Sequence, residues 1–180
     1  MFYMFFANGF EEVEAIATLD VLRRAKIDVE SVGIGAKKIT GSHGIIIECD
    51  KKDDEITFSD KLYGIILPGG MPGTTNLQSS KTVNDFIDYC SSNNFYLCAI
   101  CAAPLILGQK GLLNGKRATC FPGFENLLVG AVLNDEYVCI DGKIITAKGM
   151  GSAVNFGLAI VAAICGEDTA LQLKATLQCS

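Results

Sequence analysis

One apolar run that passes directly into a helix-like segment constrains the fold of this chain more than any other stretch. Residues 95–100 (FYLCAI) are almost continuously apolar, which is typical of a strand buried on both faces of a parallel sheet. Residues 102–107 follow as a helix, and Pro104 suits a first helical turn, where its missing N–H costs no hydrogen bond. A strand of this kind needs helices on both faces of its sheet, so we expect an α/β fold.

Strand-like and helix-like segments alternate along the rest of the chain. This order predicts an α/β sandwich with a mainly parallel central sheet. Strands are expected at residues 1–7, 29–34, 63–67 and 117–121, and hairpins over 37–50 and 137–147. Helices are expected at residues 10–25, 82–91, 124–129, 153–165 and 169–177.

Three local patterns give more detailed expectations. In helix 10–25, the residues that share an apolar side are Val13, Ile16, Ala17 and Val21. Residues 51–55 (KKDDE) are charged throughout and indicate a solvated loop. The Asp-Gly pair at 141–142 predicts a type I′ turn in the second hairpin.

Composition narrows the class of protein. The 180 residues are 49% hydrophobic, which suits a single domain over residues 1–180. The net charge of −5 with scattered basic residues argues against nucleic-acid binding, and the apolar opening, residues 1–7, is too short to span a membrane. Eight cysteines lie within apolar runs instead of forming a disulfide framework, so we expect a reducing, cytoplasmic setting.

Candidate functional residues follow three of the expected strands. In parallel sheets the site lies at the carboxyl ends of the strands. Glu14 follows the first strand, Gly69 and Gly70 follow residues 63–67, and Cys101 stands at the junction of strand and helix. Such a junction is a nucleophile elbow, in which backbone N–H groups would stabilise a thiolate and receive an oxyanion. The alternative is that Cys101 is one more small core residue.

The chain contains one histidine, His43, in the hairpin after the second strand. A Cys-His amidase or peptidase needs an imidazole beside its thiolate, so this scarcity disfavours that chemistry, and a solvent-exposed turn histidine is the preferred interpretation. A carboxyl group is the better partner: next to a thiolate it has a raised pKa and can donate a proton to the sulfur. Spacing alone does not choose between Glu11, Glu12 and Glu14.

Other chemistries find less support. Cys98 and Cys101 form a C-x-x-C pair, but Cys98 falls inside the strand, where residues three apart point to opposite faces, so we expect it in the core. The chain lacks a second C-x-x-C or paired histidines for zinc, and it has no Rossmann or Walker spacing. We therefore expect no metal and no cofactor.

Several motifs in order resemble the ThiJ/PfpI superfamily, most closely the branch containing Parkinson disease protein 7 and its bacterial relatives. They are residues 8–14 (NGFEEVE), 20–25 (DVLRRA), 67–70 (LPGG), 99–104 (AICAAP) and 141–159. The resemblance implies a flavodoxin-like three-layer sandwich, a homodimer and an oxidation-prone cysteine at the elbow. It identifies that cysteine as Cys101 and its protonated partner as Glu14.

The resemblance also assigns lesser roles. It places the oxyanion-binding N–H groups at Gly70 and Ala102, beside Gly69, and it places Arg24 and His43 near the dimer interface. The chain lacks the histidine that some relatives have before Pro122, and it has Met150 where many have proline. The first departure counts against a histidine-assisted step and leaves the Cys–Glu pair intact.

The activity that the resemblance implies is a cofactor-free glyoxalase or deglycase. Its substrate would be methylglyoxal or the early glycation adducts that this dicarbonyl forms on amines and thiols, in oxidative and carbonyl stress defence. The rival hypothesis is a non-catalytic redox sensor or stress chaperone that works through oxidation of Cys101. A cysteine amidase or peptidase is a weaker alternative.

Overall fold

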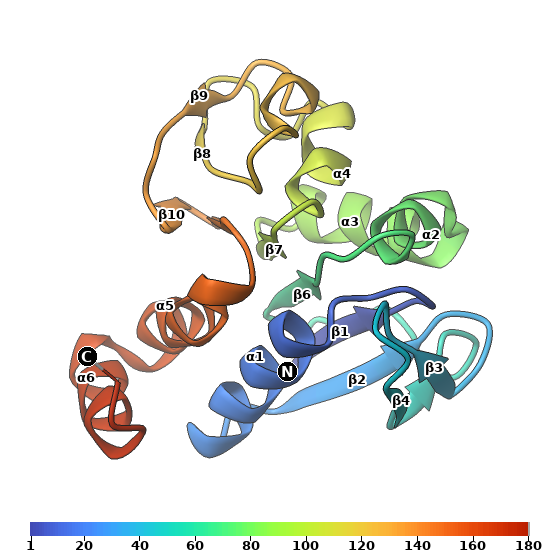
Figure 1. The fold of residues 1–180 in the computed structure, drawn as a ribbon, viewed down its shortest axis with the longest axis horizontal. Helices are drawn as coiled ribbons and strands as arrows, with labels where there is room; N and C mark the ends of the chain where they lie inside the picture. Colours follow the sequence, from blue (N-terminus) through green and yellow to red (C-terminus); the bar gives the residue numbers. More distant parts are fainter. Residues whose placement is uncertain (180) are drawn as a thin grey trace.

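The computed structural model describes residues 1–179, and its centre is a seven-stranded sheet with helices on both faces (Figure 1). The strand order is β10-β11-β7-β6-β1-β2-β5, and every neighbouring pair is parallel except the β10–β11 hairpin. The strands of this sheet are β1 (Phe2–Phe6), β2 (Val29–Gly33), β5 (Lys51–Lys52), β6 (Gly64–Leu67), β7 (Tyr96–Ile100), β10 (Val138–Asp141) and β11 (Ile144–Ala147). Two small sheets pair β3 (Lys38–Thr40) with β4 (Ile46–Glu48) and β8 (Arg117–Ala118) with β9 (Val132–Leu133).

The helices form the outer two layers of the sandwich. One face of the sheet is covered by α1 (Glu12–Arg24), α5 (Ala153–Cys165) and α6 (Glu167–Thr176), and the other by α2 (Gly73–Ser79), α3 (Lys81–Ser92) and α4 (Pro104–Gln109) (Figure 1). Two 3-10 turns, η1 (Glu125–Leu127) and η2 (Met150–Ser152), lie in the connections. The central strands β1, β6 and β7 are buried almost throughout because both faces are covered. Across residues 1–179, no helix combines the length and apolar character needed to cross a membrane.

The flavodoxin-like sandwich with its mainly parallel sheet is confirmed. Strands form where the apolar runs predicted them, although only the β8 residues of 117–121 are a strand. The helix expected at 124–129 is only the 3-10 turn η1. The expected loop at 51–55 was wrong at its start, because Lys51 and Lys52 pair with β2 as the edge strand of the main sheet. Charged side chains are common on such edges, where they discourage further strand pairing.

One other local expectation was also wrong. The second hairpin pairs Asp141 with Ile144, so its two-residue loop is Gly142 and Lys143, and of these only Gly142 has a positive φ, of 59°. A type I′ turn requires positive φ at both loop residues, so the turn is of another type. Helix α2 follows the glycine-rich segment, and the sequence analysis did not predict it.

The apolar side expected for α1 was wrong in part. Val21 is buried as expected, but Val13 and Ile16 are exposed. The buried side instead includes Glu12, Glu14 and Thr18. Two carboxyl groups therefore lie on the inner side of α1, close to the carboxyl ends of the strands.

Candidate active site

Cys101 lies at the sharp turn between β7 and the segment that leads into α4. Its φ is +63°, a conformation that residues other than glycine seldom adopt and that often marks functional sites. The Cys101 N–H donates to the Ala147 carbonyl at 2.8 Å, and the Phe121 N–H donates to the Cys101 carbonyl at 2.8 Å. Both backbone groups of the cysteine are thereby fixed, and the expected elbow is present.

Glu14 approaches the same point from the first turn of α1. It is only 1% exposed, and its Oε2 accepts a hydrogen bond of 3.0 Å from the Gly69 N–H. A Cβ atom at Gly69 would lie 2.6 Å from both the Cys101 Cβ and the Glu14 Oε2. Gly69 is thus the residue whose missing side chain lets the carboxyl group reach the thiol.

The protonation of the two groups is coupled. Burial raises the pKa of Glu14 to about 7, against the opposing effect of its hydrogen bond with Cys101. Burial, together with the charge and hydrogen bond of Glu14, raises the pKa of Cys101 to about 12. Burial and the neighbouring Glu14 carboxyl group therefore both oppose the stabilised thiolate that the sequence predicts at the elbow.

Two backbone amides oppose this effect at the sulfur. Hydrogen bonds from the N–H groups of Gly70 and Ala102 lower the pKa of Cys101 relative to burial alone. Gly70 has a φ of +90°, and a Cβ there would lie 2.3 Å from the Glu11 backbone nitrogen. The structure thus brings Cys101, Glu14, Gly69, Gly70 and Ala102 together at one edge of the sheet.

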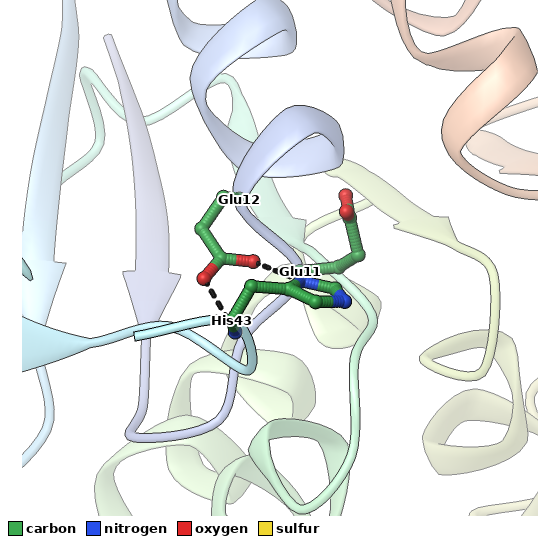
Figure 2. A group of neighbouring side chains, drawn as sticks. All are labelled: Glu11, Glu12 and His43. Carbon is green, nitrogen blue, oxygen red and sulfur yellow. Dashed lines mark hydrogen bonds and ion pairs between the residues drawn. The ribbon is translucent and has the colours of Figure 1, made fainter. Parts of the chain in front are cut away.

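Glu12 and His43 form a separate clamp beside this site. The Glu12 carboxylate is turned toward His43 and accepts hydrogen bonds from the His43 backbone N–H (2.7 Å) and ring Nδ1 (2.8 Å) (Figure 2). Burial alone would raise the pKa of Glu12, but the hydrogen bonds from His43 outweigh it and lower the pKa to about 2. The same contact raises the pKa of His43, whose side chain is 72% exposed.

Within one chain, His43 has a structural role. His43 is an exposed turn residue, as the sequence indicated, and it fastens the β3–β4 turn to the start of α1. Among the hydrogen bonds of residues 1–179, none joins His43 to Cys101, so the structure offers no support for a Cys-His hydrolase. Sequence reasoning missed the role of Glu12, because an E-E-x-E run alone does not reveal which acid faces the hairpin.

One ligand atom from each of Glu11, Glu12 and His43 lies within 4.8 Å of the others. Glu11, however, accepts a 2.6 Å hydrogen bond from the Glu14 N–H at the helix start, and no hydrogen bond is drawn between it and the Glu12–His43 pair (Figure 2). Both carboxylates are therefore already used in structural contacts, and we assign no metal to this cluster.

Arg24 does not join the site within one chain. It lies at the far end of α1, ten residues or roughly 15 Å from Glu14, and pairs with Asp20 at 2.6 Å on the surface. Cys98 is fully buried in β7, as expected. All eight cysteines, each within residues 1–179, are free, and Cys98 and Cys101 are not joined.

Comparison with known proteins agrees with this geometry. The family model described as DJ-1/PfpI matches residues 2–163. Protein dj-1beta of Drosophila melanogaster is 35% identical over 165 residues, covering 90% of this chain and 88% of that protein. Protein DJ-1 homolog B of Arabidopsis thaliana is 37% identical over 174 residues, 95% of this chain but only 40% of that protein, so this chain spans less than half of the plant relative.

A solved structure extends the comparison to the fold. The chain superimposes on a mutant of a DJ-1 superfamily protein from Salmonella typhimurium with a TM-score of 0.93 and 30% identity, covering 99% of this chain and 98% of that one. The match therefore extends over the whole sandwich. On this evidence, the chain belongs to the DJ-1/PfpI family.

Proposed function

We propose that this protein is a cofactor-free, cysteine-dependent glyoxalase or deglycase that acts on methylglyoxal or its early glycation adducts in carbonyl and oxidative stress. The observation that carries the proposal is the buried Glu14 carboxyl group, hydrogen-bonded to Cys101 with a pKa raised to about 7. A general base works best when its pKa lies near the operating pH. An ordinary exposed glutamate would be too weak a base for this role.

The proposed reaction moves protons without an external oxidant or reductant. Glu14 takes the thiol proton as the Cys101 sulfur attacks the aldehyde carbon, and this proton passes to the new oxygen to give a hemithioacetal. Glu14 then removes the hydrogen on that carbon as a proton to give an enediol and returns it to the neighbouring carbonyl carbon. The hydroxyl proton of the hemithioacetal passes to the former ketone oxygen, which leaves the thioester of lactate on Cys101. Water hydrolyses the thioester to lactate and frees the thiol.

The backbone amides would act when Cys101 attacks the aldehyde and when water attacks the thioester. Negative charge develops on an oxygen bonded to the carbon that Cys101 attacks. The N–H groups of Gly70 and Ala102 already lie beside the sulfur, where they would bind that oxygen. Loss of a single oxyanion donor commonly costs about 10²–10³ in kcat.

The test is lactate formation from methylglyoxal without glutathione. The native protein should turn over, whereas folded Cys101→Ser and Glu14→Gln should lose at least about 10²-fold in kcat/KM. Cys165→Ser, which changes an exposed cysteine at the end of α5, is the matched control and should retain activity. Absence of turnover in the native protein would contradict the glyoxalase proposal.

A second candidate function is redox sensing through Cys101. The donors around the sulfur, namely the Gly70 and Ala102 amides and a protonated Glu14, would hold the oxygens of a sulfinic acid. The raised pKa of Cys101 weighs against it, because the thiolate is the form that peroxide oxidises. Peroxide titration with peptide mass spectrometry distinguishes the two, since a sensor requires sulfinic acid at Cys101 before the exposed Cys165 is oxidised.

We further propose that the protein acts as a homodimer in a reducing, cytoplasmic setting. Val13 and Ile16 are exposed apolar residues on α1 that a second copy would cover, and Arg24 could then approach the partner's site. Eight free cysteines suit a reducing compartment. Light scattering should give a dimer mass for the native chain and a monomer for Val13→Asp/Ile16→Asp, and a native monomer would contradict the proposal.

A further inference from the structure

A hollow of about 440 Å³ opens beside the Cys101–Glu14 pair. It is lined by Phe121 and Pro122, by Tyr137, and by residues 148–152. Phe121 is bonded to the elbow through its backbone N–H, which donates to the Cys101 carbonyl at 2.8 Å. At Gly149 a Cβ would lie 3.7 Å from the Glu14 Oε1 and 3.2 Å from the Phe121 ring. The hollow therefore adjoins Glu14 through Gly149 and the Cys101 backbone through Phe121.

The lining is suited to an uncharged, flat substituent. Phe121, Tyr137 and Met150 expose large apolar surfaces around the hollow. The Phe121 ring lies in a T-shaped arrangement with the Phe124 ring, with centroids 6.5 Å apart, and its side chain remains exposed. The one ammonium group in the lining, that of Lys148, is already paired with Asp135, which leaves little positive charge for an anionic substituent.

The hollow is larger than methylglyoxal needs. Binding cavities for small molecules measure about 300–1,000 Å³, and this hollow lies within that range. The methyl group of methylglyoxal would leave most of it filled with water. A planar ring on the ketone carbon would fill more of the hollow and pack against the exposed Phe121 side chain while the aldehyde carbon lies at Cys101.

We propose that this hollow is a subsite for an aromatic substituent, so that aryl α-oxoaldehydes are better substrates than methylglyoxal. The inference rests on the proposed function for the identity of the reacting carbonyl. The expected preference for a ring over a methyl group rests on the hollow alone. Burial of a phenyl ring in place of a methyl group should raise kcat/KM by about tenfold or more.

The first experiment compares kcat/KM for phenylglyoxal and methylglyoxal. The native protein should favour phenylglyoxal by about tenfold, and the ratio should fall severalfold in Phe121→Ala. Phe58→Ala is the matched control, because Phe58 is exposed to a similar degree (52% against 47%) and lies far from the hollow, against Phe86 and Tyr89. This control should keep the native ratio. A native ratio of about one or less would overturn the subsite.

A second experiment tests the subsite without any turnover. Phenacyl bromide and bromoacetone both alkylate cysteine, forming an S–C bond with loss of bromide and of the thiol proton, and they differ only in phenyl against methyl. Peptide mass spectrometry gives the phenyl-to-methyl rate ratio at Cys101 and, as an internal reference, at the exposed Cys165. The ratio at Cys101 should exceed that at Cys165 by about tenfold and should fall in Phe121→Ala.

The two experiments separate the two proposals. Phenyl preference in alkylation with no turnover of either oxoaldehyde would sustain the aromatic subsite and overturn the glyoxalase function. Turnover of methylglyoxal with equal alkylation ratios at Cys101 and Cys165 would sustain the function and overturn the subsite. A phenyl preference that survives Phe121→Ala unchanged would also overturn the subsite as described.

Discussion

Replacing Glu14 by glutamine should make the protein more stable at neutral and alkaline pH while it removes the proposed base. The pKa of Glu14 rises from the ordinary 4.5 to about 7 in the folded protein. A raised carboxyl pKa means that ionisation costs the folded state more than the unfolded state. The penalty is absent below the unfolded pKa, grows as the pH rises from 4.5 toward 7, and is constant above that. It is below about 1 kcal/mol at pH 5 and reaches about 3 kcal/mol by pH 8.

Glutamine is a close mimic of the protonated acid. Its oxygen can accept from the Gly69 N–H, and its amide can donate to the Cys101 sulfur, but it does not ionise. Urea unfolding of both proteins at pH 5 and pH 8, at one protein concentration, gives the variant's stability advantage at each pH. That advantage should increase by about 2–3 kcal/mol from pH 5 to pH 8. Subtracting the value at pH 5 from the value at pH 8 cancels any effect of the substitution on packing that does not depend on pH.

The control is Glu48→Gln, at an exposed glutamate on β4, which should show no such trend. An advantage for Glu14→Gln that stays constant within about 0.5 kcal/mol across this range would refute the reasoning, because it would mean that Glu14 is ionised at little cost. The proposed catalytic mechanism would then lose its base of near-neutral pKa.

Three further changes probe the same region. Gly69→Ala should lower turnover by about tenfold or more and slow the alkylation of Cys101. The reason is that the added Cβ would lie 2.6 Å from both Cys101 and Glu14. Unchanged kinetics would show that the two groups need not be this close. Met150→Pro removes the backbone N–H that lowers the pKa of Glu14, at a first-turn position that accepts proline, so the acid limb of the pH–rate profile should move to higher pH. His43→Ala should reduce stability below pH 6.5, and this loss should shrink as the pH rises through the elevated pKa of His43. Unfolding of the native protein and the variant at pH 5.5 and at pH 9 measures the loss. Equal losses at the two pH values would exclude a charged pair with Glu12.

The sequence predicts the sandwich and the meeting of the candidate residues for a physical reason. Buried parallel strands are readable as apolar runs, and their carboxyl ends must share one edge of the sheet, which brings Glu14, Gly69 and Cys101 together. The raised pKa of Cys101 was not predictable from motif position, because it depends on how deeply the elbow and Glu14 are buried. The hollow beside Phe121 likewise forms between segments far apart in the chain.

Helix α1 shows how a site can override an apolar pattern. Had its most hydrophobic side faced the sheet, Val13 and Ile16 would be buried and Glu14 would have turned toward water. The helix is instead rotated so that Ala15, Thr18 and Leu22 pack inward and carry Glu14 with them. Small and polar side chains on that side allow close approach to α5, where a Cβ at Gly157 would lie 2.9 Å from the Val21 side chain. The rotation leaves apolar residues exposed and a carboxyl group buried, two unfavourable terms that a sequence selected for stability alone would avoid. Both terms become explicable if Glu14 must reach Cys101 and if a second copy covers Val13 and Ile16.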